Sequence, residues 1–167
     1  MNPLRWAHLS RTILGLALLC LASLLGLVNA ADAAAQSAPP APHIGSLTIR
    51  DAFLPQPASS SVASIYLTVK NSGSQADELI GVHTAAAASS MLMTEDANGS
   101  MGMLRDLRIP AHGQASLTPG RDHLMLEQPH HSLKLGQHVA VTLRFKRAGS
   151  LTISVPVVPL SRILSRG

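Results

Sequence analysis

The sequence predicts an all-β domain built as an antiparallel β-sandwich. Apolar and polar residues alternate with a period of two in short stretches, which is typical of strands with one buried face. Gly, Pro and Asn separate these stretches about every ten residues, a spacing that favours a sandwich. No helical periodicity of useful length follows the N-terminal region.

The N-terminal residues 1–30 have the pattern of an export signal. Arg5 and Arg11 precede an uncharged apolar run over residues 13–28, and Val28-Asn29-Ala30 offers small residues for a signal peptidase. The run is shorter than the roughly 20 residues of a spanning helix, so we expect a cleaved signal peptide and not a membrane anchor. The protein would then meet the membrane only through this segment before cleavage.

The same segment contains the single cysteine of the chain, Cys20. The exported protein would therefore enter an oxidising compartment without a disulfide or a thiolate metal ligand. Thiol-redox chemistry is excluded, and any binding of a soft metal has to use methionine and histidine.

The composition of the rest of the chain predicts a linker, one domain and a short tail. Residues 31–44 are rich in Ala, Pro, Ser and Gln, as in a linker. The domain is expected over residues 45–158 and the tail over 159–167. The predicted strands, in order, are 47–53, 62–69, 79–82, 90–93, 104–109, 115–117, 123–126, 138–145 and 151–157. The alternation is clearest at Val139, Val141, Leu143 and Phe145.

The charge pattern argues against nucleic acid as a partner. The formal net charge is +4, from 13 basic and 9 acidic residues, but Arg5 and Arg11 belong to the signal segment. The remaining charges are scattered, and aromatic residues make up only 2% of the chain. Binding to nucleic acid would favour a basic stripe with stacking aromatic side chains.

The methionines form a cluster. Apart from the initiator, all of them lie between residues 91 and 125, whereas ordinary core methionines would be spread over the strands. They occur with one histidine in three i, i+2 pairs, which are Met91 and Met93, Met101 and Met103, and His123 and Met125. Each pair would point to one face of an extended strand, so the three pairs could converge on one pocket.

Thioether sulfur with one imidazole is a donor set that selects Cu(I) over Zn or Mg. A Met-rich core edge or a flexible packing surface explains the clustering equally well. In that case the protein would be an exported β-sandwich interaction module without a metal. An enzyme with a mononuclear copper site is a third possibility, but it would need more histidines than His123.

Several segments resemble the periplasmic copper chaperone family called PCu(A)C. Two stretches, Leu117 to Leu126 (LTPGRDHLML) and Leu135 to Gly149 (LGQHVAVTLRFKRAG), are similar to this family. Ala63–Gly73 (ASIYLTVKNSG) is similar to its YLTIxNxG segment. The resemblance covers roughly residues 47–157 and implies a cupredoxin-like or immunoglobulin-like sandwich.

The copper motif of that family is a His, about ten residues, a Met, 21 residues and then His-x-Met. Here His123-Leu124-Met125 matches its end, and the spacing through residues 102–122 places Met101 at the preceding Met. The local pattern Gly-x-Met-x-Met favours Met103 instead, so both remain candidates. The first His is absent, and Met93 is the best replacement in Ser90-Met91-Leu92-Met93, with Met91 as the other choice.

The resemblance therefore implies a periplasmic copper chaperone that is not an enzyme. The predicted metal ligands are Met93, Met101, Met103, His123 and Met125. The family implies that Cu(I) passes to a copper-accepting protein, such as a cytochrome oxidase subunit or a thioredoxin-like assembly factor. We expect a monomer. His130-His131 could hold a second metal, but adjacent strand residues point to opposite faces, and a solvated loop is the simpler interpretation.

Overall fold

The alternating stretches of the sequence form the strands of a curled sheet, which the computed structural model describes over residues 40–164. The elements are β1 (His43–Ile44), β2 (Leu47–Pro55), β3 (Val62–Asn71), β4 (Asp77–His83), β5 (Ala87–Glu95), β6 (Met101–Met103), β7 (Leu107–Ile109), β8 (Gln114–Leu117), β9 (His123–Pro129), β10 (His138–Phe145), β11 (Gly149–Val158) and α2 (Ser161–Leu164). The all-β fold class is confirmed.

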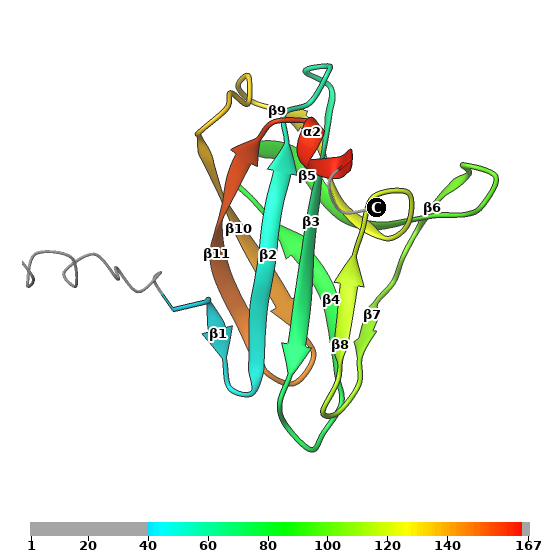
Figure 1. The fold of residues 1–167 in the computed structure, drawn as a ribbon, viewed down its shortest axis with the longest axis vertical. Coiled ribbons are helices and arrows are strands. Elements are labelled where there is room, and N and C mark those ends of the chain that lie inside the picture. The colour runs from blue at the N-terminus through cyan, green and yellow to red at the C-terminus, as the bar shows by residue number, and fades with distance from the viewer. Residues whose placement is uncertain (1–39, 165–167) are drawn as a thin grey trace, which may run out of the picture. The chain divides into compact units, whose positions relative to one another are not determined.

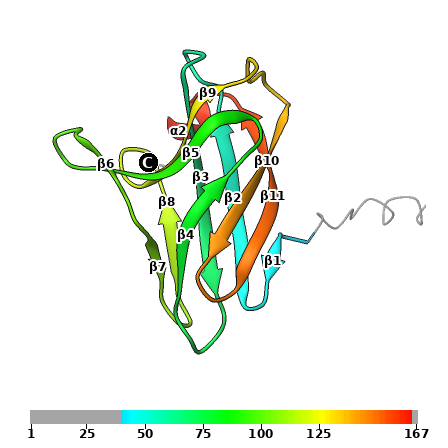
Figure 2. The same ribbon diagram turned by 180° about the vertical axis from the view of Figure 1, so that it is seen from behind.

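The strands pair in the order β6-β5-β9-β3-β2-β11-β10-β4-β7, with β1 on β2 and β8 on β3. The sheet curls so that β2, β3 and β8 lie over β4 and β10 (Figures 1 and 2). Neighbouring strands are antiparallel except β2 and β11, which run parallel at Leu54 and Val157. The sandwich prediction is confirmed with this one difference. On its other side, β2 pairs antiparallel with β3 and β11 pairs antiparallel with β10.

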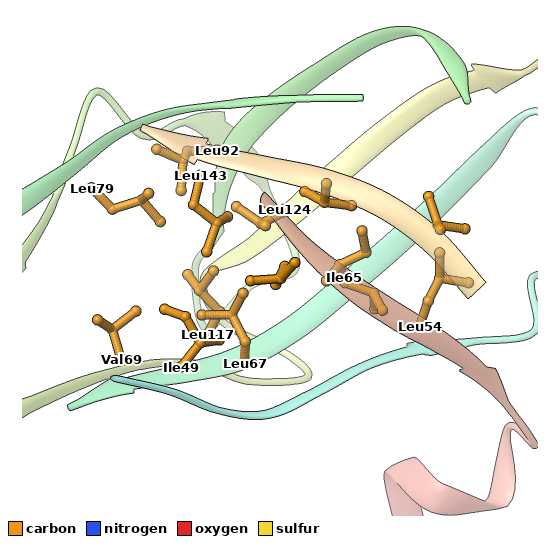
Figure 3. Close-up of a cluster of buried hydrophobic side chains, with 14 of the residues drawn as sticks. Ile49, Leu54, Ile65, Leu67, Val69, Leu79, Leu92, Leu117, Leu124 and Leu143 are labelled. Carbon is orange, nitrogen blue, oxygen red and sulfur yellow. The ribbon is translucent and has the colours of Figure 1, made fainter. Parts of the chain in front are cut away.

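The core lies between the two layers. In β10 the residues at every second position, Val139, Val141, Leu143 and Phe145, are buried, as their alternation predicts. Leu92 of β5, Leu124 of β9 and Ile65 of β3 join them in one apolar cluster (Figure 3). The opposite faces of β3, β5 and β9 are therefore turned away from this core.

Three details of the chain differ from the sequence-based expectations. β6 is a strand that the sequence did not predict, because Met-Gly-Met is too short to show alternation. The strand predicted over 104–109 is reduced to β7. β1 lies inside the predicted linker, where His43 and Ile44 pair with Thr48 and Leu47. The predicted signal peptide lies outside the described residues.

Between residues 40 and 164 the structure has no helix with the length and apolar character that crossing a membrane requires.

Candidate metal centre

A second buried layer lies on the outer face of β3, β5 and β9. Four apolar side chains, those of Phe53, Tyr66, Met93 and Met125, are buried but do not belong to the core cluster. His123 is buried with them. Their positions follow from the pleat, since Leu124 faces the core and its neighbours His123 and Met125 must face the other way.

The strand register brings the predicted donors into adjacent positions. Met93 of β5 is directly opposite His123 of β9 and directly opposite Met103 of β6. These three residues, called here the Met93 row, cross three neighbouring strands. Opposite residues of an antiparallel pair have Cβ atoms about 4.5–5.5 Å apart. Two residues along the strands, on the same face, Met91 is opposite Met125. One member of each of the three predicted i, i+2 pairs therefore lies in the Met93 row.

One ring nitrogen of His123 has no hydrogen-bond partner among the described residues. Its Nδ1 lies 2.9 Å from the carbonyl oxygen of Arg121, and because a carbonyl only accepts, Nδ1 carries the proton and donates. In the neutral ring, Nε2 then holds a free lone pair. His123 is only 2% exposed, and within residues 40–164 its Nε2 is the one buried side-chain nitrogen or oxygen without a hydrogen-bond partner.

An unsatisfied buried acceptor lowers the stability of a folded protein by about 1–3 kcal/mol. A ligand bound to this lone pair would remove that cost. A hydrogen bond from one imidazole nitrogen to a backbone carbonyl is the arrangement that orients a metal-binding histidine and fixes its tautomer. His123, which carries this free nitrogen, is directly opposite Met93, whose side chain ends in a thioether. The arrangement suits a soft metal ion held by sulfur and one nitrogen.

Aromatic rings cover this histidine on the β3 side. The Tyr66 ring centroid lies 6.4 Å from that of His123, and the Phe53 ring lies 5.4 Å beyond Tyr66. The guanidinium of Arg162, in α2, lies 5.4 Å from the centre of the Phe53 ring. These contacts keep water from one side of the imidazole. Tyr66 is not among the residues predicted from the sequence, although its position next to the core residue Ile65 assigns its side chain to the outer face of β3.

The model of the family described as "LpqE-like" matches residues 47–157, which include β2 to β10 and all but the last residue of β11. The chain belongs to the LpqE-like family. A curated relative, "Putative lipoprotein Lxx21020" of Leifsonia xyli subsp. xyli, is 36% identical over 109 residues. That match covers 62% of this chain and 65% of the relative, slightly under two thirds of the relative's length.

Solved structures with this fold include copper-binding domains. The copper-bound PCuAC domain from PmoF2 is 26% identical to this LpqE-like chain with a TM-score of 0.61, over 70% of this chain and 96% of that domain. Cu(I)-bound DR1885 from Deinococcus radiodurans is 29% identical with a TM-score of 0.55, over 78% and 86%. Its apo form is 33% identical with a TM-score of 0.54, over 75% and 89%. The resemblance to PCu(A)C domains is confirmed.

The two methionines of β6 occupy different positions in this LpqE-like protein. Sequence spacing favoured Met101, but Met101 is opposite Glu95, whereas Met103 is opposite Met93 and so lies in the row that contains His123. The register also separates the two candidates for the first position of the copper motif, since Met93 is opposite His123 and Met91 is not. The register therefore favours Met93 and Met103 as the neighbours of the free imidazole nitrogen.

The remaining histidines stand apart from the Met93 row. His130 and His131 are exposed in the turn after β9, where the backbone N–H of His130 donates to the carbonyl of Ala86. Over the described part of the chain, no three His, Cys, Asp or Glu side chains gather closely enough to hold a metal ion.

Burial raises the pKa of Tyr66 above the ordinary 10.0 of a tyrosine; the negative charge of Glu95 adds to this, and a hydrogen bond with the Ser64 side chain opposes it. The folded protein therefore keeps this proton to higher pH than the unfolded chain. We expect this contribution to stability to be complete below about pH 10 and to be lost as the pH rises through the folded pKa.

Tyr66 is the only tyrosine of the chain, so alkaline titration of the metal-free protein, followed by tyrosinate absorbance, measures this pKa directly. Tyr66→Phe is the control for the pH dependence of stability. A tyrosinate midpoint at or below that of a free tyrosine would contradict the prediction.

Proposed function

We propose that this protein is a copper chaperone that binds one Cu(I) ion through His123, Met93, Met125 and a methionine of β6, and delivers it to another exported protein. The observation that carries the proposal is the buried Nε2 of His123, which has no hydrogen-bond partner within residues 40–164 and belongs to a residue aligned with Met93 and Met103 across the strands. Membership of a fold whose solved structures include copper-bound PCuAC domains supports it.

The chemistry of these side chains suits a carrier. Thioethers and a neutral imidazole leave the charge of Cu(I) uncompensated, so they bind the ion less tightly than thiolates would and release it more readily. Met93 and Met125 lie beside His123 on strands backed by the core, so these donors are held in place before the ion arrives. A single imidazole is fewer than a copper enzyme would normally use.

The place and the recipient follow from the family resemblance. We propose export to the periplasm, in keeping with a relative described as a lipoprotein, and transfer to a copper centre such as that of a cytochrome oxidase subunit, directly or through a thioredoxin-like assembly factor. Transfer to such a centre needs a metal site that is open to another protein.

Titration of the purified protein with Cu(I) against a coloured chelator, bicinchoninate, tests the proposal. We expect one Cu(I) to be withheld from the chelator per chain, and X-ray absorption of the complex to show mainly sulfur scattering with one nitrogen. Failure to compete with the chelator would support the interaction module without a metal. A first coordination shell dominated by nitrogen would contradict the thioether ligands and would make His130 and His131 the candidate ligands.

A further inference from the structure

The side chains that the sequence predicts as copper donors differ sharply in exposure. Those on β5 and β9 are almost inaccessible, with Met93 at 9%, His123 at 2% and Met125 at 8% exposed. The two on β6 are open to solvent, with Met101 at 57% and Met103 at 73% exposed. One side of the site is therefore embedded in the protein, and the other side can be reached by another molecule.

β6 is also a short edge strand with support from one side only. It is three residues long, stands at one end of the strand order and is hydrogen-bonded to β5 alone among the described strands. The hairpin that carries it projects from the body of the domain in both views (Figures 1 and 2). Its turn is nevertheless ordered, because the Asp96 carboxylate accepts hydrogen bonds from the backbone N–H groups of Asn98 and Ser100 at 2.9 and 2.8 Å.

We propose that β6 is the surface at which a copper-exchanging partner docks, and that a soft sulfur donor of the partner replaces Met103 first. This inference rests on the proposed function. The copper–sulfur bond to Met103 breaks as a copper–sulfur bond to the partner forms, and the ion remains Cu(I) throughout. A partner of this kind carries a methionine thioether or a cysteine thiolate on an accessible protrusion.

The embedded donors cannot be displaced first by the same route. Met93 and Met125 are flanked by the core residues Leu92 and Leu124 on their own strands, so a partner atom cannot reach behind them without separating β5 from β9. His123 is held further by its hydrogen bond to Arg121 and by the Tyr66 ring. We therefore infer that the imidazole is the last ligand to release the ion.

The rate of copper loss from the loaded protein tests this order. Cu(I) protein is mixed with excess bicinchoninate in a stopped-flow instrument, and the coloured complex is followed over time. For the wild type we expect a rate that rises with chelator concentration, because the incoming ligand attacks the bound ion. Met103→Ala leaves that position already open, so we expect transfer to become at least about tenfold faster, with a smaller loss of equilibrium affinity.

The chain offers a matched control on the same hairpin. Met101→Ala removes a thioether of similar exposure that is opposite Glu95 and outside the Met93 row, so its transfer rate should stay within about twofold of the wild type. Met103→Leu keeps the size of the side chain without its sulfur and should behave as Met103→Ala does. Both β6 positions are exposed, so these variants should fold normally.

Two results would overturn the proposed order. One is a Met103→Ala protein that binds copper and transfers it at the wild-type rate. The other is a Met101→Ala protein that is accelerated as much as, or more than, the Met103 variant. A wild-type protein that binds no Cu(I) would instead contradict the proposed function itself, so the two failures are distinguishable.

Discussion

Replacing His123 with alanine should lower the affinity for Cu(I) by at least about a hundredfold. Loss of a group that merely orients a metal ligand costs about 10–100-fold in affinity, and His123→Ala removes the ligand itself together with its orienting hydrogen bond to Arg121. The remaining thioethers have no buried imidazole beside them, because His123 is the only histidine in the Met93 row. Competition with bicinchoninate measures the change.

The same substitution should leave the metal-free fold intact. It removes a buried acceptor that has no partner in the described part of the chain, which favours stability. It also removes the packing of the imidazole against Tyr66, which opposes stability. The outer face of β9 is not part of the core cluster. We therefore expect the variant to retain a cooperative thermal transition with a β-type circular dichroism spectrum.

Leu124→Ala provides the matched control, one residue along the same strand. Leu124 is fully buried on the core face, so its truncation should cost about 2–5 kcal/mol of unfolding free energy while the imidazole and thioethers stay in place. Copper affinity that falls equally in both variants would show that binding follows overall stability and would contradict a ligand role for His123.

Much of this arrangement could be predicted from the period-two pattern. The alternation of Val139, Val141, Leu143 and Phe145 defines both the strand and its buried face. The i, i+2 spacing of His123 and Met125 likewise assigns them to one face, because the pleat admits no other result. Local sequence is sufficient for these features since they depend only on residues within one strand.

The neighbours across strands could not be predicted, because they depend on register. Nothing in the pair Met101 and Met103 tells which one is opposite Met93; the turn at residues 96–100 decides it, through hydrogen bonds to Asp96. The free Nε2 of His123 could not be predicted from the sequence either. It depends on the hydrogen bond from Nδ1 to the carbonyl of Arg121 and on the Tyr66 ring that packs beside the imidazole.

Met93→His should convert the site into one that also holds Cu(II). Met93 is directly opposite His123, so this substitution sets two imidazoles side by side, as the family's usual first ligand would. Imidazole suits the harder Cu(II) ion, while Cu(I) accepts either donor. We expect Cu(I) affinity to change little and Cu(II) affinity to rise by at least about tenfold, which corresponds to about 1.4 kcal/mol.

Met91→His is the matched control for that gain. Met91 lies on the same face of β5, two residues away, but is opposite Met125 and not His123. It should therefore add less nitrogen coordination than Met93→His. Electron paramagnetic resonance of the Cu(II) forms reads out the difference, with coupling to two nitrogens expected for Met93→His and to fewer for Met91→His. Equal spectra and equal affinities in the two variants would mean that Met93 does not share the ion with His123, since proximity to that imidazole is what separates the two positions.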